Sequence, residues 1–107
     1  MKYNMYSIYD SKAGIYAFPF FQQNDAMAVR AFGTVAADPN TTINAHPGDF
    51  SVYRLGTWDD ESGVVAMDDT RMHLCTGLDV LAARERVAVR DNGGAESFSK
   101  ADNEGIN

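Results

Sequence analysis

The amino-acid sequence predicts a small α+β protein in which one helix packs on a mainly antiparallel, four-stranded sheet. Three observations support this fold class. Runs rich in aromatic and β-branched residues occur on both sides of a single amphipathic segment, turn-forming residues separate these runs in pairs, and the length of 107 residues suits one domain. The expected order of elements is therefore ββ-α-ββ.

The first pair of strands is predicted at the N-terminus. Residues 3–9 are rich in tyrosine and β-branched side chains, and residues 15–21 form a second aromatic run. Residues 10–14, which are Asp, Ser, Lys, Ala and Gly, have the composition of a turn. Pro19 cannot donate a backbone hydrogen bond, so the second strand should lie at the edge of the sheet or end its pairing near Phe18.

One helix is predicted over about residues 25–37. Asn24 is a favourable N-cap, and Pro39 disfavours helical geometry at the residue before it. Phe32 lies at the centre of an apolar stripe and should be buried, and Gly33 is expected to allow close packing against the sheet. The stripe has helical spacing and consists of Ala28, Ala31, Phe32 and Val35, widened by Val29 and Ala36.

The second pair of strands is expected at residues 50–55 and 64–67. Residues 46–49, His-Pro-Gly-Asp, form a turn that leads into the first of them. The polar segment 58–63 ends in glycine and is expected to be the hairpin loop that joins the two strands.

The pattern weakens after these strands. Leu74 and residues 78–81 suit a short strand or turn, and residues 83–90 suit either a helical turn or an irregular strand. Large apolar residues then become rare, so the remaining chain buries too little surface to offset its ordering entropy. We expect a single α+β domain over residues 1–83 and a weakly structured to disordered tail over residues 84–107.

Composition and charge restrict the classes of partner. The net charge of −6 and the pI of about 4.6 argue against long-range attraction to nucleic acid or to an anionic membrane, although a local group of aromatics and cations can still bind DNA. Cys75 is the only cysteine, so no internal disulfide can form, and it is expected to be a small buried hydrophobic residue. No segment is apolar over membrane-spanning length, and we expect no membrane partner and a cytoplasmic location.

The ionisable residues do not suggest an enzyme. His46 and His73 have no Cys or His at metal-ligand spacing, and no nucleotide-binding or nucleophile motif occurs. The acidic groups at residues 59–61 and 68–69 are expected to be solvated charged loops. The sequence therefore predicts a non-enzymatic protein without a metal or cofactor.

The aromatic strands carry the candidate binding site. Side chains alternate between the two faces of a sheet, so one face should pack on the helix while the other presents aromatics. Either that second face binds nucleic acid or a protein, or it is covered by the chain after residue 67 or by a second subunit. The candidate nucleic-acid contacts are Tyr16, Phe18 and Tyr53, which would stack on bases, and Lys12, Arg30 and Arg54, which would bind phosphates.

A series of short motifs occurs over about residues 5–80. In order they are Tyr6-Ser7-Ile8-Tyr9-Asp10, Lys12-Ala13-Gly14, Pro19-Phe20-Phe21, Ala28-x-Arg30-Ala31-Phe32, Asp38-Pro39, His46-Pro47-x-Asp49-Phe50-Ser51-x-Tyr53-x-Leu55-Gly56 and Trp58-Asp59-Asp60. In order and spacing these motifs resemble the small non-structural protein of gokushoviruses. Gokushoviruses are microviruses with circular single-stranded DNA genomes.

The resemblance implies a phage protein that is made in the host bacterial cytoplasm and is absent from the mature capsid. That family is described as DNA-binding, with a role in moving replication from double-stranded to single-stranded DNA synthesis and packaging. The resulting hypothesis is a non-enzymatic accessory of single-stranded DNA replication or packaging, which binds single-stranded DNA or the viral or host replication proteins. The alternative is a dimeric protein-interaction or assembly factor that does not bind DNA. A homo-oligomer, most simply a dimer, is expected in either case.

Overall fold

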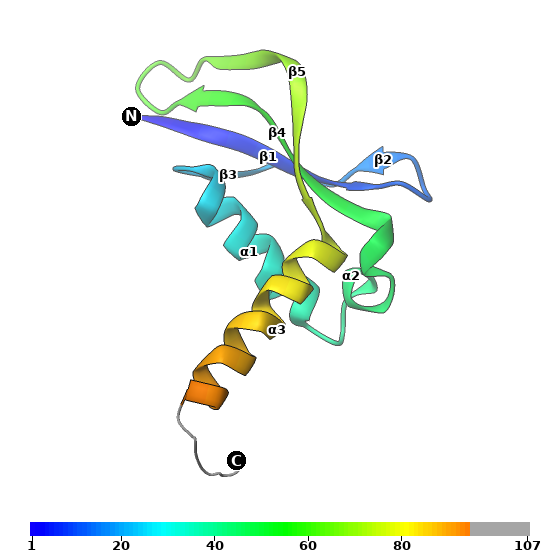
Figure 1. The fold of residues 1–107 in the computed structure, drawn as a ribbon. Coiled ribbons are helices and arrows are strands. Elements are labelled where there is room, and N and C mark those ends of the chain that lie inside the picture. Colours follow the sequence, from blue (N-terminus) through cyan, green and yellow to red (C-terminus); the bar gives the residue numbers. More distant parts are fainter. Residues whose placement is uncertain (95–107) are drawn as a thin grey trace.

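The computed structural model describes residues 1–94, which form a five-stranded antiparallel sheet with its helices on one side (Figure 1). The predicted α+β class is confirmed, and the sheet has one strand more than expected. The elements in chain order are β1 (Lys2–Asp10), β2 (Ile15–Tyr16), β3 (Phe20–Gln22), α1 (Asp25–Ala37), α2 (Thr42–Ala45), the 3-10 turn η1 (Pro47–Asp49), β4 (Phe50–Asp59), β5 (Val65–Thr76) and α3 (Gly77–Gly94).

The additional strand arises because the predicted second strand is divided in two. β2 and β3 both pair with β1, and residues 17–19 interrupt them. Pro19 lies in this interruption, where its missing backbone N–H costs no ladder hydrogen bond. The strand order is β2-β1-β4-β5, with β3 also on β1, so the expected position of this segment at the sheet edge is confirmed.

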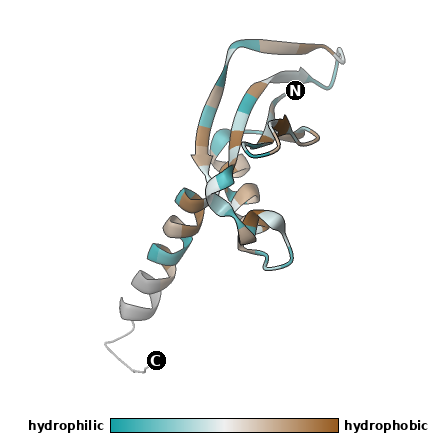
Figure 2. Cartoon of the chain, turned by 90° about the vertical axis from the view of Figure 1, so that its right-hand side faces the viewer, coloured by the Kyte–Doolittle hydropathy of each residue, from teal (hydrophilic) through white to brown (hydrophobic). Residues whose placement is uncertain are grey.

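The last strand is longer than predicted. β5 continues to Thr76 rather than ending at Met67, and it pairs with β4 on both sides of a bulge. Arg54 pairs with Met72 and Gly56 with Met67, which leaves residues 68–71 opposite one residue of β4. The bulge lets this polar stretch leave the regular ladder without ending the strand. Hydrophilic and hydrophobic residues are interspersed along the β4–β5 hairpin (Figure 2).

The predicted helix has the expected bounds. The Asn24 side chain caps α1 by accepting a hydrogen bond from the backbone N–H of Met27 at 2.9 Å. Phe32 is 1% exposed, as expected, whereas Val35 is 40% exposed, so the buried stripe is rotated slightly from the predicted one. The core lies between α1 and the sheet, and its buried members are Tyr6, Ala28, Phe32, Ala36, Ile43, Val52 and Val80.

The expectation of a single helix was wrong, because α3 is a second long one. Thr76 and Asp79 form a reciprocal cap at its start: each side chain accepts a hydrogen bond from the backbone N–H of the other residue, both at 3.0 Å. The helix crosses the expected domain boundary at residue 83 without a break and ends at Gly94. Of the expected tail over residues 84–107, residues 95–107 lie outside the described part of the chain. No helix within residues 1–94 is long and apolar enough to cross a membrane.

The close contact made by Gly33 is with α3 and not with the sheet as expected. A Cβ atom on Gly33 would lie 2.8 Å from Cγ2 of Val80 and 3.4 Å from Cδ of Arg84. Glycine at this position therefore lets α1 and α3 approach each other closely.

Candidate functional site

The two faces of the sheet have different environments. Tyr6 and Val52 point to the helix side, where both are fully buried with Phe32 of α1. Because side chains alternate along a strand, Tyr9 and Tyr53 point to the opposite face. Among the described residues, the helices all lie on the first side (Figure 1), so this second face is the candidate binding surface.

Three tyrosines from three strands meet on this second face. Tyr9 of β1 is directly opposite Tyr16 of β2, and their ring centroids are 4.6 Å apart. Tyr53 of β4 presents its ring edge-on to both, at 6.1 Å from Tyr9 and 5.8 Å from Tyr16. His73 of β5 extends the group, with its ring 5.2 Å from that of Tyr53. We call Tyr9, Tyr16, Tyr53 and His73 the tyrosine cluster.

A cation lies next to the tyrosine cluster. The guanidinium carbon of Arg71 is 5.6 Å from the centre of the Tyr16 ring, within the range of a cation–π interaction. Arg71 belongs to the bulge of β5, which is what allows an edge-strand side chain to reach a tyrosine of the opposite edge. Arg71 is exposed and Tyr16 is 39% exposed, so both remain accessible from solvent.

A second aromatic group lies further along the same face. Trp58 of β4 lies 5.8 Å from Tyr3 and 5.5 Å from Phe21, measured between ring centroids. Met5 and Ser7 separate this group from the tyrosine cluster, and both are buried. The Ser7 hydroxyl donates to the backbone carbonyl of residue 17 at 2.6 Å, so the chain after β2 covers this position.

Acidic residues adjoin this second group. β4 ends with Trp58 and Asp59, and the turn to β5 continues with Asp60 and Glu61. The backbone N–H of Glu61 donates to Asp59 Oδ1 at 2.9 Å, and this hydrogen bond lowers the pKa of Asp59. The N-terminal ammonium lies 2.7 Å from Asp60 Oδ1 and offsets one of the three negative charges. The net charge beside Trp58 is still negative, so a phosphate approaches the tyrosine cluster more easily than Trp58.

Arg54, predicted to bind phosphate, points instead to the helix side. Its Nη1 donates to Asp25 Oδ2 at 2.7 Å, and its Nε lies 3.4 Å from Asp68 Oδ2. The Tyr6 hydroxyl donates to Asp25 Oδ1 at 2.8 Å. Burial is the main cause that raises the pKa of Tyr6 to about 12. Arg54 thus joins β4 to α1 and β5. It cannot share a face with Tyr53, because consecutive residues of a strand point to opposite faces.

The other predicted contacts are dispersed. Lys12 is exposed in the turn between β1 and β2, and Arg30 is exposed on α1, on the helix side of the sheet. Phe18 is 96% exposed in the segment between β2 and β3, outside the tyrosine cluster. Of the six predicted contacts, the structure brings together only Tyr16 and Tyr53. The structure does not bring Lys12, Arg30 and Arg54 together on the aromatic face.

The sequence interpretation missed Tyr9, Arg71 and His73 as members of this site. Tyr9 could have been found, because a turn over residues 11–14 sets the register that places it opposite Tyr16. Arg71 and His73 could not, since they lie in the part of β5 that was not predicted as a strand.

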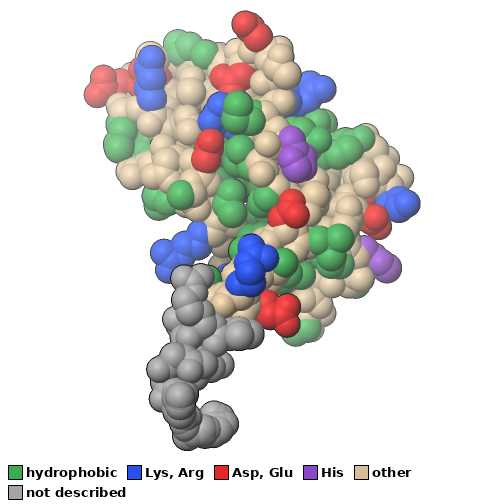
Figure 3. Space-filling model, viewed as in Figure 1, with side chains coloured by type: hydrophobic (Ala, Val, Ile, Leu, Met, Phe, Trp, Pro, Cys, Tyr) green, Lys and Arg blue, Asp and Glu red, His purple; other side chains and the backbone are tan. Residues whose placement is uncertain are grey.

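Charges on the surface are mixed. On the side of the molecule seen in Figure 3, Lys and Arg side chains are separated from one another and interspersed with Asp and Glu. Within residues 1–94, no group of three or more His, Cys, Asp or Glu is arranged to hold a metal ion. Burial raises the pKa of the half-buried Cys75 thiol, which disfavours the reactive thiolate.

Comparison with known proteins connects the chain to phages. The model of the family described as Phage ORF5 protein matches residues 3–80. No curated protein and no solved structure shows significant similarity to the chain. The matched region includes all five strands and α1, and it ends in the first turn of α3.

Proposed function

The chain belongs to the Phage ORF5 protein family, and from this premise we propose that it is a non-enzymatic accessory protein of single-stranded DNA replication or packaging in a phage of the microvirus type. In this proposal it acts in the host bacterial cytoplasm and binds single-stranded DNA through the tyrosine cluster. The motif resemblance to gokushovirus non-structural proteins supports the type of phage.

The observation that carries the proposal is the accessible tyrosine cluster with Arg71 beside it. Each base has a flat aromatic face, so stacking on tyrosine is tolerant of sequence and contributes roughly 1–3 kcal/mol per base. Bases of duplex DNA already stack on each other inside the helix. The cluster therefore suits single-stranded DNA better than duplex DNA.

The charges of the protein determine the expected affinity for DNA and its dependence on salt. With a net charge of −6 the protein gains little from general attraction to phosphate. Arg71 supplies a cation for a phosphate beside the tyrosine cluster, and the acidic residues near Trp58 disfavour phosphates at the other end of the face. We expect modest affinity, dominated by stacking, with a shallow dependence on salt.

A titration with labelled single-stranded oligonucleotides, followed by fluorescence anisotropy, tests the proposal. Tyr53→Ala removes the tyrosine that contacts both Tyr9 and Tyr16 and should weaken binding by about 5- to 150-fold, the equivalent of one stacked base. Ile15→Ala is the matched control, because Ile15 neighbours Tyr16, is 62% exposed and points to the opposite face. Its affinity should equal that of the wild type.

The alternative function is an interaction or assembly factor that does not bind DNA. It is favoured by an exposed apolar groove between the two long helices, described below. Wild-type protein that fails to bind single-stranded DNA even at low salt would reject the DNA proposal in favour of this alternative. If the wild type and Tyr53→Ala bind equally well, the protein binds DNA through a surface other than the tyrosine cluster.

A further inference from the structure

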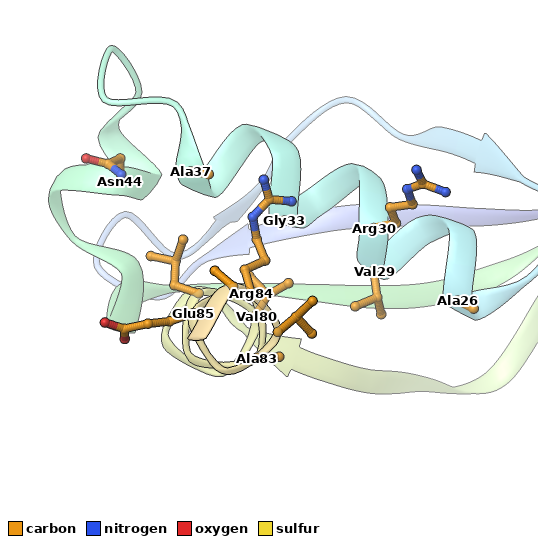
Figure 4. Close-up of a pocket in the computed structure, with 13 residues that line it drawn as sticks. Ala26, Val29, Arg30, Gly33, Ala37, Asn44, Val80, Ala83, Arg84 and Glu85 are labelled. Carbon is orange, nitrogen blue, oxygen red and sulfur yellow. The ribbon is translucent and has the colours of Figure 1, made fainter. Parts of the chain in front are cut away.

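A groove of about 810 Å³ lies between α1 and α3 (Figure 4). Its walls carry small and apolar side chains, including Val29 of α1 and Ala83 and Val87 of α3. Arg84 extends from α3 toward Gly33 of α1. A surface with this shape and polarity suits an apolar helix face.

The second half of α3 leaves the rest of the domain. Figure 1 shows it extending away from the sheet and from α1. Val80, in the first half, is 6% exposed, whereas Val87, two turns later, is 49% exposed. Short helices are marginal in water unless they pack an apolar face against a partner. Among the residues whose side chains the structure describes, which end at Ala88, the second half of α3 leaves Val87 half exposed and available to a partner.

The groove and the extending helix together form a self-complementary surface. Val87 belongs to the second half of α3 and also lines the groove, so one two-fold axis places the second half of each α3 in the groove of the other copy. Such an arrangement covers the groove and the second half of α3 at once. One helix from an unrelated protein would cover only the groove.

The charges on α3 fit the same arrangement. Arg84, Glu85 and Arg86 are consecutive and form no ion pair with any residue that the structure describes. A two-fold axis reverses their order in the second copy, so Glu85 of one chain can lie beside an arginine of the other. Arg30, at the edge of the groove, offers a further cation to the same glutamate.

We propose that the α1–α3 groove is the interface of a homodimer, in which α3 of each copy occupies the groove of the other. The groove lies on the helix side of the sheet and the tyrosine cluster on the opposite face. The dimer therefore leaves both tyrosine clusters free, and the proposal does not depend on DNA binding.

Sedimentation velocity of the full chain over a range of concentrations tests the proposal. The wild type should reach twice the 11.7 kDa mass of one chain. Val87→Asp places a charge in the interface and should weaken dimerisation at least about tenfold. Val64→Asp is the matched control, because Val64 is 59% exposed in the β4–β5 turn, away from the groove. It should dimerise like the wild type.

A charge-exchange pair adds a test that does not rely on apolar packing. Glu85→Arg makes three consecutive cations on α3 and should weaken the dimer, and adding Arg84→Glu should restore it by restoring opposite charges. Circular dichroism establishes that each variant is folded. A wild type that stays monomeric overturns the proposal, and so does a dimer that Val87→Asp and Glu85→Arg leave unchanged.

Discussion

Tyr6, Asp25 and Arg54 form the polar connection between the sheet and α1. Tyr6 is completely buried, and its hydroxyl donates to the carboxylate of Asp25, which also accepts from Arg54. A buried hydroxyl requires such a partner, since leaving it unsatisfied costs about 1–3 kcal/mol. The contact fixes the first turn of α1 against β1 and β4.

Tyr6→Phe should lower the free energy of unfolding by about 1–2 kcal/mol, because the phenyl ring keeps the packing but loses the hydrogen bond to a charged group. Urea unfolding at neutral pH measures this loss. Tyr53→Phe is the matched control: the Tyr53 hydroxyl makes no hydrogen bond to a side chain or backbone atom within residues 1–94, and its loss should cost little.

The same residue predicts a dependence on alkaline pH. The pKa of Tyr6 rises from 10.0 to about 12 in the folded protein, so folding favours the neutral phenol. This stabilisation is complete below pH 10 and is lost as the pH rises toward 12. The difference in unfolding free energy between wild type and Tyr6→Phe should therefore shrink over that range. A constant difference would show that Tyr6 ionises equally easily in both states.

At the scale of elements, the contact between α1 and α3 depends on the absence of a side chain at Gly33. Glycine within a helix costs about 1 kcal/mol relative to alanine. Glycine at this position allows α1 and α3 to pack closely, because a Cβ atom there would lie 2.8 Å from Cγ2 of the buried Val80. Valine is stiff at χ1, so its methyl group cannot easily move away.

Gly33→Ala should destabilise the protein by about 1 kcal/mol, because an overpacking cost of about 1–3 kcal/mol exceeds the gain in helix propensity. In a Val80→Ala background the clash disappears, and the same change should stabilise by up to about 1 kcal/mol. A double-mutant cycle by urea unfolding measures this reversal. If Gly33→Ala already stabilises the wild type, the two helices are less tightly packed than the structure indicates.

For the molecule as a whole, the net charge of −6 and the location of Arg71 determine how DNA binding should respond to salt. Each phosphate contact adds about 0.7 to the slope of log affinity against log salt concentration for single strands. Arg71→Ala should therefore flatten the slope by up to about 0.7. Tyr53→Ala should lower affinity with little change in slope, because stacking releases few counterions.

Arg54→Ala provides the comparison for this measurement. Its guanidinium is paired with Asp25 and Asp68 on the helix side, so removing it should lower stability and leave the salt slope of the folded protein unchanged. A slope that falls with Arg54→Ala and not with Arg71→Ala would place the phosphates on the helix side of the sheet.

Most of the local structure can be predicted from the sequence. Tyrosine and β-branched runs predict β1 and the first part of β4, and Asn24 with the stripe around Phe32 predicts α1 over about residues 25–37. The expected start of the hairpin loop at residue 58 was wrong, because Trp58 and Asp59 belong to β4. These features follow from interactions between residues close in the chain, so they can be read without knowing the fold. One local feature was overlooked: Thr76 and Asp79 have the spacing of a helix cap and predict the start of α3.

Contacts between side chains from distant segments cannot be predicted in this way. The face that Arg54 occupies, the reach of Arg71 to Tyr16 and the contact of Gly33 with Val80 all depend on strand register, a bulge and the crossing of two helices. Shifting a strand by one residue moves every side chain to the other face, and a bulge does this locally. Register and bulges arise from pairing between distant segments, and no pattern within either segment specifies them.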